Sequence, residues 1–485
     1  MPEVNPIYMN RREFLANSIL ALGMSGKGSQ GASGNTAGQA PSFQLKVDPA
    51  KVLGDIPPDF MGLGYEISSV ARQGLLSGRN RSYVQLVRAL GAQGVIRVGG
   101  NTSDYSAYSS EGQAVSAPKA TVVNKAVIED LGTFLEATGW KLIWGLNLGS
   151  GTPQQAVEEA QAVAAAVKEK LLALEIGNEP DLFAKAHRPQ GYEYAQFLEE
   201  YRRYRDAIRA KLPHVPFAGP DVARQTDWVT QFAADEGRDI KLLTHHYYAE
   251  GPPQNPASTM ENLLRGNERL PRILAECRSA SQSANVPYRI CETNSCFGGG
   301  KPGVSDTFAA ALWGLDFLFT LASADSSGVN LETGVNQLGL ISSYSPLGDD
   351  EHGNYSAKPL YYAMLAFAHA SRGRRVNVQY DAGDLNVKAY AVRGEDQRLT
   401  VTLINKEAAR DVGVNIVSTR AFAHGDLLRL AAPSLESKTG VTLGGSVVAS
   451  DGQWTASRRE QLATHGNEYA VSVPAASAAV VTFAG

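Results

Sequence analysis

The feature that most constrains this chain is an alternation, from about Phe60 to Ala370, of short apolar runs with longer segments of helical period. Parallel strands need a long connection between them, so this alternation predicts a parallel sheet with helical crossovers. Eight runs can be counted, the number that closes a (β/α)8 TIM barrel. They are FMGLGYEI at 60–67, GVIRVGG at 94–100, KLIWGLNLG at 141–149, LLALEIGNE at 171–179, VPFAGPDV at 215–222, DIKLLTHHYY at 239–248, YRICETN at 288–294 and GVNLE at 328–332.

Segments between these runs have apolar residues every three or four positions, as in TPQQAVEEAQAVAAAVKEK at 152–170 and AQFLEEYRRYRDAIRAKL at 195–212. This period is typical of helices that bury one face. We therefore expect an α/β fold whose barrel extends over residues 60–372.

The pattern changes after residue 372 to short alternating runs such as LTVTLIN at 399–405 and YAVSVPAASAAVVTFA at 469–484. Alternation with a period of two predicts strands, so we expect an antiparallel β-sandwich domain over residues 373–485. Residues 41–59 also have strand and turn character, and we expect them to pair with the sandwich. A chain of 485 residues is long enough for both parts.

The N-terminus resembles a twin-arginine export signal. Arg11 and Arg12 precede Phe14 and Leu15 in NRREFLANSILALGM, and a stretch rich in Gly, Ser and Ala follows up to Ala40. The apolar run is too short to span a bilayer, so we expect no membrane span. The hypothesis is that residues 1–40 form a signal and linker, and that the protein is periplasmic or secreted. The alternative is a disordered terminus with a chance arginine pair.

Composition argues against several classes of partner. The net charge is −4 and there is no basic stripe, so we expect no nucleic acid partner. Three cysteines, Cys277, Cys291 and Cys296, make neither a disulfide framework nor a four-ligand zinc pattern, and whether two of them are bridged is open. The eight histidines have no metal-ligand spacing. We expect no metal and no cofactor, and the sequence leaves the oligomeric state open.

Two glutamates stand where a barrel places its chemistry, at the C-terminal ends of strands. Glu179 ends the fourth run in LEIGNEPD, and Glu292 lies in the seventh run in RICETNS. Glycoside hydrolysis needs a carboxylic acid and a second carboxylate, and strands four and seven face each other across the barrel mouth. Either glutamate alone is compatible with an ordinary rim carboxylate, but the pair favours catalysis. Glu175 points to the same face of the strand as Glu179 but lies deeper in the barrel, so we expect it to have a structural role.

The sixth run ends in THHYYAEG, which places His246 or Tyr248 in the mouth next to strand seven. A Tyr hydroxyl there can hold a carboxylate nucleophile in one rotamer, and a His can hydrogen-bond the acid/base. The alternative is ordinary packing of aromatic rings. Near strand two, RVGGNTSD offers Arg97, Asn101 and Asp104 on a Gly-rich loop that matches no nucleotide fingerprint and suits sugar hydroxyls better.

These motifs, together with ALWGLDFLFTLASA, resemble glycoside hydrolase family 79, the family of β-glucuronidases and heparanase, within a clan of retaining (β/α)8 enzymes. The resemblance covers nearly everything after residue 43. The stretch LRLAAPSLESKTGVTLGGSVVASDGQW at 427–454 looks like the β-domain of the fungal and bacterial β-glucuronidases more than that of heparanase.

The resemblance implies roles for individual residues. Glu179 would be the general acid/base and Glu292 the nucleophile, with Asn178 as the hydrogen-bond partner of the sugar 2-hydroxyl. Glu66, in GYEIS, and Asp104 look like ligands of the hydroxyls of the terminal sugar.

The loop after strand seven, SCFGGGKPG at 295–303, lies where related β-glucuronidases bring backbone amides and a Tyr toward the uronic carboxylate. Gly298, Gly299 and Gly300 could present amides to an anion. Phe297 stands where that Tyr is expected, and strand eight reads NLETG in place of a more familiar Asn-Phe-His. We therefore expect the amides, with Tyr344 or Lys301, to bind the carboxylate. A flexible Gly-rich lid without ligand contacts is the alternative.

The leading hypothesis is an exo-acting, retaining β-glucuronidase whose substrate is a β-glucuronide. Its rivals are another retaining exo-β-glycosidase of the clan and an endo-acting enzyme similar to heparanase. An endo enzyme that binds a sulfated chain needs a cleft lined with Lys and Arg, and the sequence has no such cluster. A carbohydrate-binding protein on a hydrolase scaffold is the non-enzymatic alternative, which the presence of both Glu179 and Glu292 disfavours.

Overall fold

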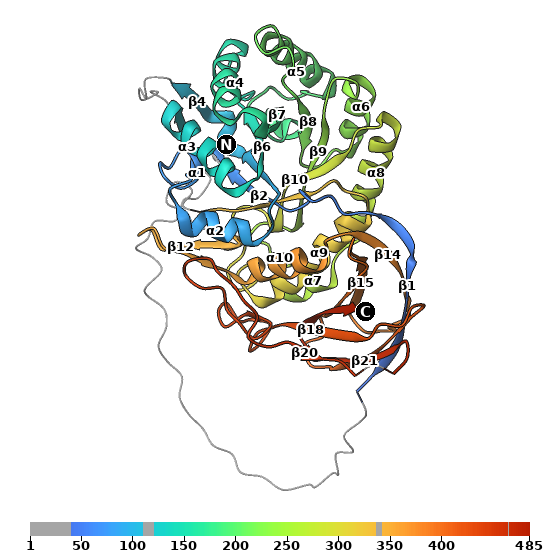
Figure 1. Ribbon diagram of the computed structural model, residues 1–485. Coiled ribbons are helices and arrows are strands. Elements are labelled where there is room, and N and C mark those ends of the chain that lie inside the picture. Colours follow the sequence, from blue (N-terminus) through green and yellow to red (C-terminus); the bar gives the residue numbers. More distant parts are fainter. Residues whose placement is uncertain (1–39, 110–120, 336–341, 464) are drawn as a thin grey trace, which may run out of the picture. The chain divides into compact units, whose positions relative to one another are not determined.

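Eight parallel strands, one from each predicted run, form a barrel in the computed structural model (Figure 1). In chain order, strands one to eight of the barrel are β2 (Gly62–Glu66), β3 (Val95–Gly99), β6 (Lys141–Leu146), β7 (Leu171–Ile176), β8 (Ala218–Val222), β9 (Leu242–Glu250), β10 (Tyr288–Cys296) and β11 (Val329–Glu332). Their order around the sheet follows the chain, and a bridge between Leu174 and Phe217 joins the β7 and β8 edges. The predicted (β/α)8 barrel is confirmed.

The structure describes residues 40–109, 121–335, 342–463 and 465–485. The expected export signal therefore lies outside the described residues, except for Ala40. Within these ranges, no helix combines the length and the apolar character needed to cross a membrane.

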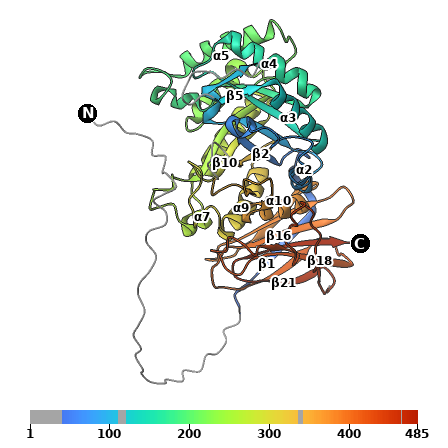
Figure 2. The same cartoon turned by 90° about the vertical axis from the view of Figure 1, so that its left-hand side faces the viewer.

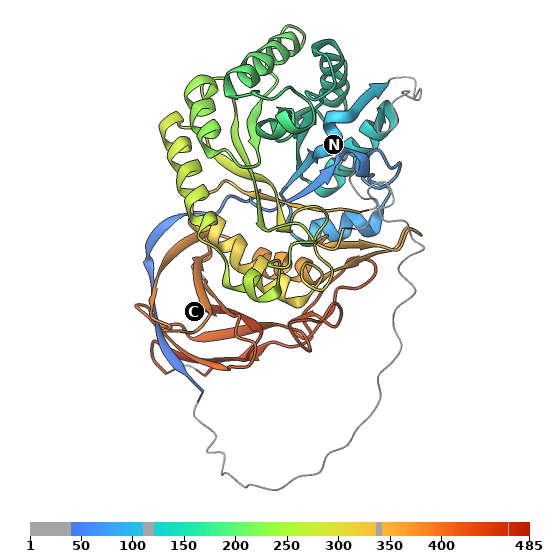
Figure 3. The same cartoon turned by 180° about the vertical axis from the view of Figure 1, so that it is seen from behind.

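Helices surround the barrel strands, as the views from the front and from behind agree (Figures 1 and 3). The predicted helices at 152–170 and 195–212 correspond to α4 and α5, and α4 begins with a capping box between Thr152 and Gln155. The helices are α1 (Ile67–Val70), α2 (Arg81–Ala89), α3 (Lys125–Thr138), α4 (Pro153–Val167), α5 (Tyr194–Arg209), α6 (Thr226–Glu236), α7 (Met260–Arg265), α8 (Arg269–Ala284), α9 (Phe308–Ser323) and α10 (Pro359–Ala370).

Short elements decorate the loops of the barrel. Three 3₁₀ helices are η1 (Asn101–Tyr105), η2 (Lys168–Lys170) and η3 (Pro180–Lys185). Two small strand pairs are β4 (Ser106–Ser109) with β5 (Thr121–Asn124), and β12 (Leu347–Asp349) with β13 (Tyr355–Ala357). The helices η1 and η3 directly follow strands two and four, so they border the end of the barrel where the site residues gather.

The barrel interior changes from apolar to polar toward the C-terminal ends of the strands. A small buried cluster contains Val95, Ile143, Ala173, Ala218, Leu242 and Cys291. Two residues further along strands two and four, the inward positions are Arg97 and Glu175, which are fully buried. This step in polarity places charged groups directly beneath the barrel mouth.

The C-terminal region forms a ten-stranded sheet with its own apolar core. Its strands are β1 (Ser42–Asp55), β14 (Arg374–Tyr380), β15 (Val387–Arg393), β16 (Leu399–Asn405), β17 (Val412–Ser418), β18 (His424–Ala431), β19 (Thr442–Leu443), β20 (Glu460–Gln461), β21 (Glu468–Val473) and β22 (Ser477–Ala484). Strand β1 lies between β14, to which it is antiparallel, and β17, to which it is parallel. The predicted β-domain is thus confirmed, with one parallel pair among the strands described.

Helices α9 and α10 pack against strands of this sheet (Figure 2). On α9, Asp316 accepts a hydrogen bond from the Tyr390 hydroxyl at 2.6 Å and pairs with Lys406 Nζ at 2.7 Å. The rings of Phe319 and Tyr390 stack with their centroids 4.8 Å apart. The sheet thus packs against the outer side of α9 and α10, the last two helices of the barrel.

Candidate active site

Glu179 and Glu292 lie close together at the C-terminal end of the barrel. One carboxylate oxygen of each and a ring nitrogen of His246 lie within 4.8 Å of one another. Strand β7 ends at Ile176, so Glu179 lies in the turn after the strand and not at its last position. Its backbone φ is +53°, and its amide donates to the carbonyl of Asp221 at 2.9 Å. A side chain in such a constrained turn is fixed in direction.

Glu292 is held at both carboxylate oxygens. The Tyr248 hydroxyl donates to Oε1 at 2.9 Å, and Arg97 Nη1 donates to Oε2 at 2.8 Å. Burial and the charge of Glu292 raise the pKa of Tyr248 well above its usual value, so the phenol keeps the proton that it donates. Glu292 is only 6% exposed. Two donors to a buried carboxylate hold it in a single rotamer.

Glu179 has a different environment, because its neighbour is a histidine. Nδ1 of His246 lies 3.1 Å from Oε1 of Glu179, and Nε2 lies 2.7 Å from Oδ1 of Asp221. Burial opposes a charge on His246, but Asp221 and Glu292 raise its pKa well above the usual value. Burial raises the pKa of Glu179, while His246 acts in the opposite direction. Glu179 thus tends to keep a proton, whereas both carboxylate oxygens of Glu292 accept hydrogen bonds.

The guanidinium of Arg97 joins the residues beneath the acid pair. Besides Glu292, it donates to Glu175 Oε2 at 3.0 Å, to Asn178 Oδ1 at 2.9 Å and to Asp221 Oδ2 at 2.5 Å. Burial and the charge of Asp221 raise the pKa of Glu175 to about 7, in spite of Arg97. Burial also acts to raise the pKa of Asp221, but Arg97 and His246 lower it to about 2. Glu175, which the sequence predicted to be structural, is fully buried in this network.

Glu66 lies at the end of strand one and holds the loop after strand two. Its carboxylate accepts hydrogen bonds from the amide of Asn101 at 3.2 Å, and from the amide and hydroxyl of Thr102 at 2.7 and 2.6 Å. Burial and the charge of Glu292 raise its pKa to about 7. Asn101 in turn lies 3.5 Å from the amide of Asn178, which precedes Glu179.

Asp104 differs from its expected role as a ligand of sugar hydroxyls. It is buried, and its Oδ1 accepts from the amides of Leu148 and Gly149 at 3.2 and 2.9 Å. Its Oδ2 accepts from the amide of Asn178 at 3.1 Å. Both oxygens are therefore used to hold backbone, because the loop turns this carboxylate inward. Asp104 thus holds the segment that carries Glu179 in place.

The glycine loop after strand seven has an unusual backbone. Gly298, Gly299 and Gly300 have φ values of +77°, +90° and +81°, a region that other residues avoid. The amides of Gly298 and Gly299 donate to no acceptor within the described ranges, whereas the Gly299 carbonyl accepts from Ser343. Phe297 is 40% exposed, with its ring edge-on to that of Tyr248.

Lys301 and Tyr344 take different places around this loop. The ammonium of Lys301 donates to the carbonyl of Asn255 at 3.1 Å. Tyr344 is buried, and its ring lies 6.2 Å from that of Tyr248. Of the two side chains expected to bind a carboxylate, Tyr344 is the one near the acid pair.

The sequence-based reasoning missed the roles of two acids. Asp221 lies near the end of strand five, β8, and binds both His246 and Arg97. Glu332 ends strand eight and lies close enough to Glu66 and Glu292 for their charges to affect its pKa. A signal was present in each case, because both acids stand at strand ends of a predicted barrel.

Metal binding does not suit this set of residues well. Glu179, His246 and Glu292 could offer one ligand atom each, and so could Glu175, Asp221 and Cys291. A histidine ligand must present a lone pair, but both ring nitrogens of His246 already face carboxylates and its pKa is raised. The second group is occupied by Arg97, which binds Glu175 and Asp221.

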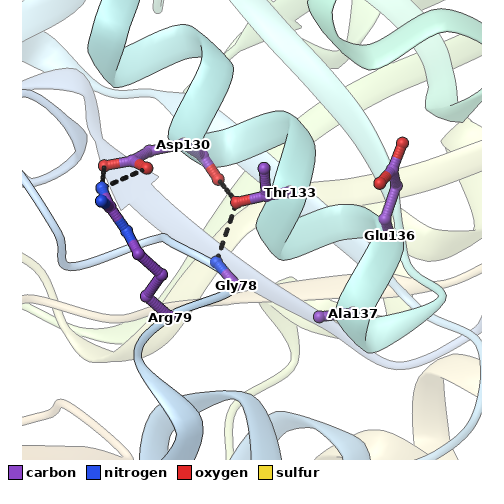
Figure 4. Close-up of a pocket in the computed structure, with 6 residues that line it drawn as sticks. All are labelled: Gly78, Arg79, Asp130, Thr133, Glu136 and Ala137. Atoms are coloured by element: carbon purple, nitrogen blue, oxygen red, sulfur yellow. Dashed lines mark hydrogen bonds and ion pairs between the residues drawn. The ribbon is translucent and has the colours of Figure 1, made fainter.

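A separate hollow lies on the outside of the barrel, between the loop before α2 and helix α3 (Figure 4). There, Arg79 pairs with Asp130 at 2.9 Å, and the Gly78 amide donates to the Thr133 hydroxyl at 3.0 Å. The hollow is lined by Gly78, Arg79, Asp130, Thr133, Glu136 and Ala137. None of these belongs to the acid cluster, and the Arg79–Asp130 pair satisfies its own charges, so we assign it no part in the chemistry.

This chain is similar in sequence to known glycoside hydrolases. Residues 389–480 match the glycosyl hydrolase family 79 C-terminal beta domain. The chain is 28% identical over 391 residues to a β-glucuronidase of Aspergillus niger, a match that covers 72% of this chain and 69% of that protein. It is 26% identical over 227 residues to the heparanase of Gallus gallus, covering 41% of this chain and 40% of the relative.

The fold has a solved counterpart. The structure of a 4-O-α-L-rhamnosyl-β-D-glucuronidase from Fusarium oxysporum 12S superposes with a TM-score of 0.75 over 91% of this chain and 100% of that one, at 17% sequence identity. This likeness shows a common fold. The match of the C-terminal domain and the two sequence relatives together support the assignment of this chain to glycoside hydrolase family 79.

Proposed function

We propose that the protein is a retaining, exo-acting β-glucuronidase in which Glu179 is the general acid/base and Glu292 the nucleophile. The observation that carries the mechanism is the short separation of the two acids, with an oxygen of each within 4.8 Å. Retaining glycosidases have carboxyl groups about 5–5.5 Å apart, whereas inverting enzymes need about 6.5–9.5 Å to accommodate a water molecule. The separation supports double displacement.

The environments of the two acids support their division of labour. In the first step, Oε1 or Oε2 of Glu292 attacks the anomeric carbon, the glycosidic bond breaks, and Glu179 gives its proton to the leaving oxygen. In the second step, Glu179 takes a proton from water as the water oxygen attacks that carbon and releases Glu292. His246 lies against Glu179 and away from bulk solvent, so it orients the acid in both steps.

The glucuronide specificity rests on the relatives and on the glycine loop. Two similar proteins carry the name β-glucuronidase. In this chain, the amides of Gly298 and Gly299 could donate to the C6 carboxylate of a terminal sugar, with Tyr344 close by. Glu66 and Asn178 would contact the sugar hydroxyls, which places a single terminal residue over Glu292.

The test is an activity screen of the purified protein on 4-nitrophenyl β-glucuronide, β-glucoside, β-galactoside and β-xyloside. We expect the β-glucuronide to have the highest kcat/KM, and NMR of the first product to show the β-anomer. A higher kcat/KM on a neutral glycoside would instead support another exo-glycosidase of the clan. Release of internal fragments from a glucuronate-containing polysaccharide would support an endo-acting enzyme.

We also propose that residues 1–40 direct export. The basis is the Arg11–Arg12 pair and the following apolar run. Replacement of both arginines by lysine in a bacterial host should retain the protein in the cytoplasm. Unchanged export of that variant would contradict the proposal.

A further inference from the structure

Glu332, the last residue of strand eight, is a buried acid without a partner. It is 2% exposed, and neither of its carboxyl oxygens has a hydrogen-bond partner among the residues that the structure describes. By contrast, Asp221 pairs with His246 and Arg97, and Glu292 with Tyr248 and Arg97. An unpaired buried carboxylate is unfavourable when ionised, so Glu332 has a strong preference for its neutral form.

The local structure accommodates this carboxyl group closely. Glu332 is paired in register with Gly64 of β2, and a Cβ at Gly64 would lie 2.5 Å from Oε2 of Glu332. Any larger residue at position 64 would displace the acid. The glycine therefore provides the space in which Glu332 lies inside the barrel, at the level of Arg97.

The groups that face Glu332 come from each neighbouring part of the barrel. Glu292 and Glu66 oppose its ionisation, while Arg97 and His246 favour it. Every guanidinium nitrogen of Arg97 already donates to another residue, and both ring nitrogens of His246 face other carboxylates. Burial and the two glutamates consequently raise the pKa of Glu332 well above its usual value. The tyrosines whose pKa is affected by its charge are Tyr65, Tyr248 and Tyr344.

We propose that Glu332 is a specificity-determining residue that admits an anionic sugar when it is protonated and repels it when it is ionised. The inference rests on the proposed function, because only a uronic acid brings a further carboxylate next to Glu292. Glu332 acts through space and touches no reacting atom. An ionised Glu332 would add a negative charge to a site that already holds ionised Glu292, and like charges within about 10 Å repel appreciably in a protein interior.

The first experiment compares two substrates across pH in the parent enzyme. We expect the ratio of kcat/KM for 4-nitrophenyl β-glucuronide to that for the β-glucoside to fall roughly tenfold as pH rises through the titration of Glu332, measured over the whole pH range in which the enzyme stays folded. The ratio removes those effects of pH on catalysis that both substrates share. A ratio that stays constant with pH would overturn the inference.

The decisive variant is Glu332→Gln, which keeps the shape and cannot ionise. In this variant the ratio should stay nearly constant across the same pH range. The matched control is Glu159→Gln, because Glu159 is also buried, has a pKa raised to about 7 by burial, and lies outside the site, bonded to Trp144. The control should keep the parent's fall in the ratio. A fall in Glu332→Gln as large as in the parent would overturn the inference.

A measurement on the parent alone keeps the inference testable if the variant does not fold. Calorimetric titration with glucuronate at the pH where that ratio falls, in two buffers of different ionisation enthalpy, should show proton uptake on binding, and titration with glucose should show none. Absence of uptake with glucuronate would overturn the inference. An enzyme that cleaves β-glucosides and leaves β-glucuronides intact would overturn the proposed function, which is a different result.

Discussion

Nδ1 of His246 lies 3.1 Å from Oε1 of Glu179, and the opposite nitrogen of the same ring faces Asp221. The proposed acid/base is therefore next to a cation that a buried aspartate stabilises. This arrangement couples the proton of Glu179 to a residue on strand six and to another on strand five.

His246→Phe should shift the pH dependence of catalysis. The hydrogen bond and charge of His246 lower the pKa of Glu179 against the effect of burial, so their loss should raise it further. The basic limb of kcat/KM, which reports ionisation of Glu179, should move to higher pH by roughly one unit, and kcat should fall roughly tenfold as orientation is lost. The control is His245→Phe, since His245 is buried on the other face of the strand. A basic limb that moves equally in both variants would contradict this relationship.

Variants of the two acids should separate their roles. Glu292→Gln should abolish turnover on every substrate, because no covalent intermediate can form. Glu179→Ala should retain activity on substrates whose leaving group needs no protonation, and added azide should increase that activity by attack on the glycosyl-enzyme. Equal losses on activated and unactivated substrates, without azide rescue, would contradict the assignment.

The sequence predicted the parts of this site that depend on strand order. Alternating runs place Glu179 and Glu292 on opposite sides of one mouth, since strand count alone determines that arrangement. The contact between Asp221 and His246 was not predicted, because it depends on which side chains turn toward each other between neighbouring strands. The direction of the Asp104 side chain could not be predicted either. The sequence shows that Asp104 follows strand two, but a carboxylate in a loop can face either the sugar or backbone amides. The packing of the loop at Leu148 and Gly149 decides that, and the sequence pattern does not contain it.

Replacing Arg97 should cost more stability than replacing any surface arginine. Arg97→Met would leave Glu175, Asp221 and Glu292 buried without their cation, and breaking such a network typically costs about 3–5 kcal/mol. Arg79→Ala breaks the ion pair with Asp130 where Arg79 has a side chain that is 79% exposed, and should cost about 0–1 kcal/mol. Urea unfolding of both variants measures the difference. Similar midpoints for the two variants would show that the barrel network does not stabilise the fold.

Glu159→Gln should stabilise the protein at neutral pH and not in acid. Burial raises the pKa of Glu159 to about 7 from the ordinary 4.5 of the unfolded chain. Below about pH 4.5 both states hold the proton and no penalty arises. As pH rises toward 7 the unfolded chain ionises while the folded protein resists, so stability is lost. Glutamine avoids this loss and can still accept from Trp144, for a gain of about 1–3 kcal/mol at pH 7. Unfolding curves at both pH values test it, and a gain that is equal at both would contradict the explanation.

Substitutions at Gly299 should show whether the glycine loop binds the carboxylate of the sugar. Proline cannot adopt a φ of +90° and has no amide hydrogen, so Gly299→Pro removes a donor and also distorts the turn. Gly299→Asn is the matched control, because asparagine keeps the amide and tolerates positive φ better than most residues. Among the residues that the structure describes, a Cβ at this position meets only Ser342 Oγ at 3.8 Å, so the control should fit. We expect Gly299→Pro to lower kcat/KM for the β-glucuronide at least roughly tenfold more than for the β-glucoside, and Gly299→Asn to affect both substrates alike. If Gly299→Pro reduced both activities in equal proportion, the loop would have a structural role and the carboxylate would be bound elsewhere.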